Sequence, residues 1–318
     1  MNQSDNHYLS QFENKMFSCC ATTETNKTTT KEKHNKTRAK KTDEEEKPGF
    51  DTIALHGGYT PDTSVVYGIG HGAPRGVPVY RTTPFVFKDT EHAANLFNLS
   101  ELGNIYSRLM NPTNHVLESR YAQLEGGHPL SALSVASGTN AIFYAIINLA
   151  ANGDNIVSSS SLYGGTYTMM NNLLPDFGIT VQFVDGKDPE AFAAAANENT
   201  RAFFCESCAN PSLEICDIEK IAEGAHEIGL PLIVDSTFST PYLTKPFDHG
   251  ADVITNSLTK WIGGHGACLG GIIVDKGTFN WGAGEFKECF ALDSFSKTMY
   301  LMRILFYFNS TTRETSPF

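Results

Sequence analysis

From about residue 130 onward, short apolar runs alternate with longer stretches of helical periodicity. The strand-like runs are 130–136, 155–158, 179–184, 201–205, 230–235 and 252–256. The helical stretches between them are 140–151, 163–174, 189–197 and 217–228. This alternation predicts an α/β fold with a mostly parallel, doubly wound sheet and helices on both faces. Because ligands bind such sheets at the carboxyl ends of the strands, the polar residues at those ends are the functional candidates.

The composition is that of a globular protein, with 318 residues of which 41% are hydrophobic and 19% charged. A chain of this length buries about three-quarters of its unfolded surface, so it folds without disulfide bonds. Its seven cysteines are odd in number and irregularly spaced, which argues against a secreted disulfide framework and favours a reducing compartment. No apolar run of about 18 residues is present, so we expect no membrane-spanning helix.

The net charge of −11 comes from 24 Lys and Arg against 35 Asp and Glu. Residues 1–48 hold nine basic and eight acidic side chains, so nearly all the excess negative charge lies in the remainder. An acidic body argues against nucleic-acid binding, which needs a clustered basic surface. A small anion remains possible as a ligand, because a few donors suffice to bind it.

Residues 1–48 are rich in Thr, Asn and Lys, with one apolar pair, Met16-Phe17. Such a segment cannot bury enough apolar surface to offset its ordering entropy, so we expect it to be disordered. It lacks the apolar region of a secretory signal, and its acidic run at 43–46 argues against an organellar transit peptide. We therefore expect a cytoplasmic protein, with organellar targeting as the open alternative.

The first candidate site is the segment 136–140, where a strand ends and a helix begins at once. Small residues there leave backbone N–H groups free, and the helix dipole favours a phosphate. The alternative is that Ser137 or Thr139 only caps the helix. The glycines at 68–72 give an incomplete dinucleotide fingerprint with prolines where a helix must follow, so we interpret them as a flexible loop.

The second candidate is the segment 255–266, where a strand leads into hydroxyls, Lys260 and a glycine-rich turn. Lys260 is either a solvated surface charge or a Schiff-base lysine, whose amine must be partly desolvated. His265 has no partner at metal-ligand spacing, so we interpret it as structural. Cys205 and Cys208 form a lone CxxC, for which buried small residues at a strand end are favoured over a zinc or redox role. No metal is predicted.

Three further residues follow strands or open a helix. Asp235 ends the run 230–235 and is either a cap or a charge directed at a ligand, and Asn210 before Pro211 is either a turn residue or a ligand contact. Tyr163 offers an aromatic face beside two glycines. A pyridoxal phosphate site needs a phosphate-binding loop, an aromatic plate, a donor to the ring oxygen, an anion at the ring nitrogen and a lysine. The chain supplies these in that order.

Between about residues 51 and 275 the chain resembles the cysteine/methionine-metabolism pyridoxal-phosphate enzymes, which have the aspartate-aminotransferase-like (type I) fold. The motifs that carry this resemblance are HAANLF at 92–97, NIYSRLMNPT at 104–113 and KWIGGHG at 260–266. Within the family it is most like the O-acetylhomoserine sulfhydrylases. Methionine gamma-lyases resemble Tyr-Gly-Cys-Thr after the stacking tyrosine, where this chain has Gly165. Many relatives continue Gly-His-Gly-Asp or Gly-His-Ser-Asp, whereas here Ala267 and Cys268 follow Gly266.

The resemblance implies a role for each candidate. Lys260 would bind the cofactor covalently and shuttle the substrate α proton. Asp235 would pair with the pyridine nitrogen, Tyr163 would stack on the ring and take part in proton transfer, and Asn210 would contact the ring hydroxyl. The phosphate would be held by Ser137, Gly138, Thr139, Ser257 and Thr259, and by Tyr106 and Arg108 of a neighbouring subunit. The shared site implies a homodimer or homotetramer.

The implied reaction replaces the acetate of the amino acid O-acetylhomoserine with sulfide or a thiol, giving homocysteine or methionine. Cystathionine gamma-synthase, cystathionine gamma-lyase and methionine gamma-lyase activities are the alternatives within the family.

The implied organisation has four parts: a disordered extension (1–48), an N-terminal arm and subunit-contact segment (49–115), a cofactor-binding α/β domain (116–290) and an atypical tail (291–318). The family's smaller C-terminal domain is not recognisable, so we expect a C-terminally truncated member. Two hypotheses follow. The chain is an active sulfur-transfer enzyme, or it is an inactive cofactor-binding chain that pairs with a full-length homologue.

Overall fold

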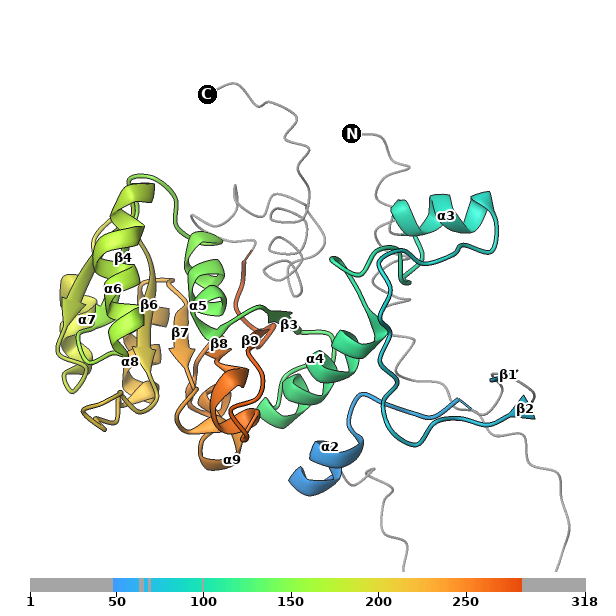
Figure 1. Cartoon of the computed structure of the whole chain (residues 1–318). Coiled ribbons are helices and arrows are strands. Elements are labelled where there is room, and N and C mark those ends of the chain that lie inside the picture. The colour runs from blue at the N-terminus through green and yellow to red at the C-terminus, as the bar shows by residue number, and fades with distance from the viewer. Residues whose placement is uncertain (1–47, 63–65, 68–69, 99, 282–318) are drawn as a thin grey trace, which may run out of the picture.

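The computed structural model describes residues 48–62, 66–67, 70–98 and 100–281 (Figure 1). The segment expected to be disordered, 1–48, lies outside the described residues except for Pro48, and so does the expected atypical tail, 291–318. At the centre is a sheet of seven strands: β3 (Ala132–Val135), β4 (Asn155–Ser159), β5 (Thr180–Val184), β6 (Thr200–Glu206), β7 (Leu232–Asp235), β8 (Val253–Asn256) and β9 (Gly271–Asp275). Their order in the sheet is β3-β9-β8-β7-β6-β4-β5.

The sheet is mostly parallel, as the alternating pattern predicts. Strands β5, β4, β6, β7 and β8 pair parallel to one another, whereas β9 runs antiparallel to both β8 and β3. Each of the six predicted strand regions contains a strand. The alternation does not predict β9, because an antiparallel neighbour needs no helical crossover. Only the five-residue element η4 lies between β8 and β9.

The helices of the sheet region occupy the stretches between the strands. They are α5 (Gly138–Ile147), α6 (Gly164–Thr168), the π-helical turn η1 (Met169–Leu173), η2 (Leu174–Phe177), α7 (Pro189–Ala195), α8 (Ile218–Glu227), α9 (Thr240–Leu243), η3 (Pro246–His249) and η4 (Leu258–Ile262). All four predicted helical stretches are helical. The stretch 163–174 differs in kind, because α6 gives way to the wider turn η1 instead of continuing as one α-helix.

Two apolar cores lie on the two faces of the sheet. Because strand residues alternate between faces, neighbouring residues enter different cores: Phe204 and Ile233 join the core that contains α5, whereas Phe203 and Val234 join the core that contains α8. These side chains are fully buried, and each contributes about 1.5–3 kcal/mol of transfer free energy. Helices therefore cover both faces, and the doubly wound α/β prediction is confirmed.

The elements that precede β3 lie to one side of the sheet, and α4 is the one that packs next to β3 (Figure 1). They are α2 (Phe50–His56), β1 (Val66–Tyr67), β2 (Gly70–His71), α3 (Thr90–Phe97) and α4 (Pro112–Glu125). The side chain of Asn111 caps α4 by accepting the Thr113 N–H at 2.9 Å, and Gly126 ends it with a φ of 89°. The loop interpretation of 68–72 is partly wrong, since β2 pairs antiparallel with β1.

Among the described residues, no helix is both long and apolar enough to cross a bilayer.

Candidate active site

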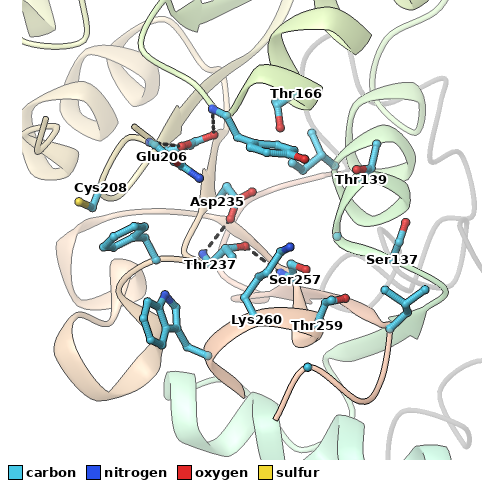
Figure 2. Close-up of a pocket in the computed structure, with 18 of the residues that line it drawn as sticks. Ser137, Thr139, Thr166, Glu206, Cys208, Asp235, Thr237, Ser257, Thr259 and Lys260 are labelled. Atoms are coloured by element: carbon cyan, nitrogen blue, oxygen red, sulfur yellow. Dashed lines mark hydrogen bonds between the residues drawn. The ribbon is translucent and has the colours of Figure 1, made fainter. Parts of the chain in front are cut away.

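A cavity of about 630 Å³ lies at the carboxyl ends of β6, β7 and β8 (Figure 2). Most of the residues singled out from the sequence line it: Ser137, Gly138, Thr139, Tyr163, Asn210, Asp235, Ser257, Thr259 and Lys260. The fold brings them together because parallel strands present their carboxyl ends at one edge of the sheet.

The N-terminus of α5 forms one wall of the cavity. The Ser137 hydroxyl accepts the Asn140 N–H at 3.1 Å, so this serine caps the helix. The N–H groups of Gly138 and Thr139 belong to the first turn, where a helix offers no internal acceptor. A Cβ atom on Gly138 would lie 2.5 Å from the Cβ of Ser257. Glycine is therefore required for the two segments to meet, and both remain open to an anion.

Lys260 lies in η4, directly after the loop that follows β8. Its backbone leaves helical geometry at φ −94° and ψ −116°, and its side chain points into the cavity on the same side as Asp235 and Thr237 (Figure 2). The Thr259 hydroxyl, also expected to hold phosphate, donates to the Gly270 carbonyl at 3.2 Å and accepts the Gly270 N–H at 3.1 Å. This exchange ties η4 to the residue that precedes β9.

Asp235, the last residue of β7, is buried at 9% exposure. Its Oδ1 accepts the N–H of Thr237 at 2.8 Å. Burial raises the pKa of this carboxyl, because the charged form is poorly solvated. Within the described part of the chain, no Lys, Arg or His forms an ion pair with it. A buried carboxyl that lacks a protein cation and faces a cavity suits the protonated ring nitrogen of pyridoxal phosphate, so the residues present fit this cofactor.

Glu206, the last residue of β6, was not among the site residues predicted from the sequence. This side chain is 5% exposed and lines the cavity. Its Oε1 accepts the Tyr163 N–H at 2.7 Å, and its Oε2 accepts the Asn210 N–H at 3.2 Å. Burial, and then the neighbouring Asp235, raise the pKa of Glu206 to about 7. The rule that singled out Asp235, a carboxylate directly after an apolar strand, identifies Glu206 equally well.

Thr237 was also missed. Its Oγ1 accepts the Ser257 N–H at 2.8 Å, and its own N–H bonds to Asp235. It thus joins the ends of β7 and β8. The signal in the sequence is the turn that an aspartate forms with the residue two positions on.

Aromatic side chains form another part of the cavity wall. The Phe238 and Trp261 rings meet edge to face with centroids 6.1 Å apart. Cys208 also lines the cavity (Figure 2), so the interpretation of Cys205 and Cys208 as buried small residues holds only for Cys205. Over the described residues, no group of three or more His, Cys, Asp or Glu is placed to hold a metal.

Tyr106 and Arg108 do not line this cavity. They lie in the loop between α3 and α4, where Tyr106 bridges to Pro84 and the Arg108 guanidinium carbon lies 5.5 Å from the centre of the tyrosine ring. Tyr106 is 38% exposed. The fold thus does not bring these two residues to the site of their own chain.

The fold and this cavity define a type I pyridoxal-phosphate protein, and comparisons with known proteins place the chain within that class. The profile of the Cys/Met metabolism PLP-dependent enzymes matches residues 51–293. The chain belongs to this family, as the motifs at 92–97, 104–113 and 260–266 predict.

The curated relatives include an O-acetyl-L-homoserine sulfhydrylase of Leptospira meyeri, which is 53% identical over 238 residues, covering 75% of this chain and 52% of the relative. A homocysteine synthase of Schizosaccharomyces pombe is 51% identical, covering 73% and 52%. This chain therefore spans about half the length of the curated relatives it matches.

Solved structures are similar as well. A Campylobacter jejuni chain assigned as an O-acetylhomoserine (thiol)-lyase and solved with N′-pyridoxyl-lysine-5′-monophosphate has a TM-score of 0.74 and 38% identity, covering 82% of this chain and 65% of its own. Cystathionine gamma-lyase of Lactobacillus plantarum has a TM-score of 0.64 and 31% identity, covering 81% and 63%. The expected fold class is thereby confirmed.

Proposed function

We propose that this chain binds pyridoxal phosphate in the cavity and replaces the acetate of O-acetylhomoserine with sulfide or a thiol, giving homocysteine or methionine. The observation that carries the proposal is the buried carboxyl of Asp235, which faces the same cavity as Lys260 and has no cation partner among the described residues. The choice of substrate rests on relatives named O-acetyl-L-homoserine sulfhydrylase and homocysteine synthase.

The residues divide the binding task by their chemistry. The first turn of α5, with Gly138 and Thr139, binds phosphate through backbone N–H groups and the helix dipole. Ser257 and Thr259 add hydroxyl groups from the other wall. The carboxylate of Asp235 pairs with the ring nitrogen and keeps it protonated. The ring of Tyr163 would lie against the cofactor, and the Asn210 side chain would contact its ring hydroxyl.

Bound pyridoxal phosphate supplies an electron sink that accommodates negative charge developing at the substrate α-carbon. The amine of Lys260 would hold the cofactor before substrate arrives, and it would then take the substrate α proton and return it. The bond between the γ-carbon of the substrate side chain and the acetate oxygen breaks, and a bond between that γ-carbon and sulfur forms. The thiol loses its proton and acetate leaves, so the reaction is O-acetylhomoserine plus thiol to the sulfur amino acid plus acetic acid.

The proposal includes a second copy of the chain, because Tyr106 and Arg108 do not reach the cavity of their own chain. In the assembly they reach the phosphate of the neighbouring subunit, where the planar guanidinium binds two phosphate oxygens at once. A homodimer or homotetramer follows, and sedimentation of the full chain tests it.

The first experiment is a visible absorption spectrum of the purified full chain mixed with pyridoxal phosphate. We expect a band that is lost in Lys260→Ala. It persists in Lys220→Ala, which removes an exposed lysine of α8 paired only with Asp217. The band then changes on addition of O-acetylhomoserine, and sulfide yields homocysteine.

Three results contradict parts of the proposal. Absence of a Lys260-dependent band overturns the cofactor assignment. A band that ignores O-acetylhomoserine overturns the substrate and favours an inactive chain that pairs with a full-length homologue. Release of a 2-oxo acid from methionine or cystathionine, without use of O-acetylhomoserine, identifies a gamma-lyase instead.

A further inference from the structure

Two segments that are distant in sequence, the start of α6 and the end of β6 with its following turn, meet at one side chain that lines the cavity. Glu206 ends β6, Tyr163 opens α6, and Asn210 lies in the turn beyond β6. The two carboxylate oxygens of Glu206 accept one backbone N–H each, from Tyr163 at 2.7 Å and from Asn210 at 3.2 Å. No other side chain contacts both segments through the hydrogen bonds of the described residues.

We propose that Glu206 is a positioning residue of the site: its carboxylate ties the backbone of Tyr163 to the backbone of Asn210 and thereby sets both side chains against the bound ring. This inference rests on the proposed function, because the ring in question is that of pyridoxal phosphate. The roles proposed above, ring stacking by Tyr163 and ring contact by Asn210, do not include this task of Glu206.

The exposure of the two side chains makes such a tie necessary. Tyr163 is 49% exposed and Asn210 is exposed as well, so packing against neighbouring side chains holds neither firmly. The positions of these two side chains therefore depend on how their backbones are held. A carboxylate at 5% exposure on a strand of the central sheet is a rigid anchor, because the register of β6 with β7 fixes Glu206 opposite Asp235.

Only a carboxylate meets this requirement. A glutamate side chain accepts through both oxygens, whereas glutamine offers one accepting oxygen and one donating NH₂. Since both partners here are N–H donors, the NH₂ of Glu206→Gln would face a donor. One of the two backbone groups would then lose its acceptor inside a buried site, which costs more than the bond itself contributes.

Placement beside Asp235 adds a second consequence. Glu206 interacts electrostatically with four titratable groups: the carboxyl of Asp235 and the thiols of Cys205, Cys208 and Cys216. Two acidic groups therefore face one cavity. A protonated ring nitrogen at Asp235 also favours the charged form of Glu206, which is the form that accepts from both N–H groups.

The experiment compares Glu206→Gln with Asp275→Asn in the full chain. Asp275 is a matched control: it is buried, and it accepts the Gly277 N–H at 2.9 Å and the Trp281 Nε1–H at 3.2 Å. It pairs with Val253 at the start of β8, so it lies at the edge of the sheet opposite the cavity. Both variants are expected to lower the melting temperature, so stability alone does not distinguish them.

Three readouts separate positioning from stability. Amide hydrogen exchange, measured without cofactor, is expected to quicken about tenfold at Tyr163 and Asn210 in Glu206→Gln and to stay unchanged there in Asp275→Asn. The dissociation constant for pyridoxal phosphate is expected to rise about tenfold in Glu206→Gln only. The visible circular dichroism of the bound cofactor, which reports how its ring is held, is expected to change in Glu206→Gln only.

Glu206→Asp extends the test, because it keeps the charge but shortens the side chain by one methylene. It is expected to protect one of the two amides and to restore part of the affinity. The inference is overturned if Glu206→Gln keeps the exchange rates, affinity and dichroism of the unaltered chain, or if Asp275→Asn changes them equally. If the unaltered chain itself binds no cofactor, the proposed function fails, and the role of Glu206 fails with it.

Discussion

Gly138 and Ser257 approach each other so closely that no side chain fits between them. A Cβ atom on Gly138 would lie 2.5 Å from the Cβ and 2.9 Å from the Cα of Ser257. The first turn of α5 and Ser257, which follows β8, are therefore in direct contact where they line the cavity. This contact brings the free N–H groups of the helix beside the hydroxyl of Ser257, which is the arrangement that phosphate binding requires.

Gly138→Ala is expected to separate these two segments. Because the opposing atoms include backbone, the added methyl group cannot be accommodated by rotating a side chain. We expect the dissociation constant for pyridoxal phosphate to rise at least tenfold and the melting temperature to fall, as measured by absorbance titration and calorimetry.

Gly224→Ala is the matched control. Gly224 lies inside α8, and an added Cβ would meet only the Cβ of Ala193 at 3.9 Å. Alanine favours the helix over glycine by about 1 kcal/mol, so this variant is expected to keep its cofactor affinity and to be slightly more stable. Equal affinity in Gly138→Ala and the unaltered chain would show that the contact between Gly138 and Ser257 does not contribute to phosphate binding.

The residues at the carboxyl ends of the strands were predictable because one sequence pattern identifies them. An apolar run bounded by a polar residue identifies both the strand and the residue at its carboxyl end, as at Asp235. The parallel arrangement then gathers these ends at one edge, even though the residues are far apart in the chain. Lys260 follows from the same pattern, applied to the strand 252–256.

Other features lacked a clear signal. Helix α4 buries Ser119 and Glu125 together with Tyr121 and Ala122, so its buried face is not an apolar stripe and its periodicity is weak. Glu206 has the same sequence signal as Asp235, a carboxylate at the end of an apolar strand, but its task is visible only when the N–H groups of Tyr163 and Asn210 are located. Contacts between backbone groups of different segments are set by tertiary packing, not by local pattern.

Thr237 provides a second test of how the strand ends are held together. Its Oγ1 accepts the Ser257 N–H at 2.8 Å, and Thr237→Val removes this acceptor while keeping the shape of the side chain. The unpaired N–H costs about 1–3 kcal/mol, and the segment that carries Lys260 loses one of its hydrogen bonds to the residues that follow β7. We expect lower stability and weaker cofactor binding.

Thr237→Ser retains the hydroxyl and serves as the control for that substitution. Urea unfolding and absorbance titration of the two variants decide the matter. The serine variant is expected to match the unaltered chain in affinity, whereas a valine variant that binds as tightly as the serine variant would contradict the role of this hydrogen bond.

The stability of the chain without cofactor is expected to fall as the pH rises from about 5 to 8. Burial raises the pKa of Glu125 to about 8, of Asp275 to about 7 and of Glu206 to about 7. Across this window the folded chain keeps protons that the unfolded chain has released, so the free energy of unfolding decreases with pH. His226 acts in the same direction, because its bond to Asp252 raises its pKa and the benefit is lost on deprotonation.

Urea unfolding at several pH values measures this slope, and Glu125→Gln isolates the largest contributor. Glu125 accepts the Tyr121 hydroxyl at 2.9 Å, while its buried Oε2 has no hydrogen-bond partner among the described residues. The amide cannot ionise, so the variant is expected to show a shallower fall in stability between about pH 5 and 8. His128 opposes the trend, since burial lowers its pKa, but it is one group against these three carboxyls and those of Glu118 and Asp235, whose pKa values burial also raises. Stability that rises with pH over this range would mean that the buried carboxyls are ionised in the folded chain.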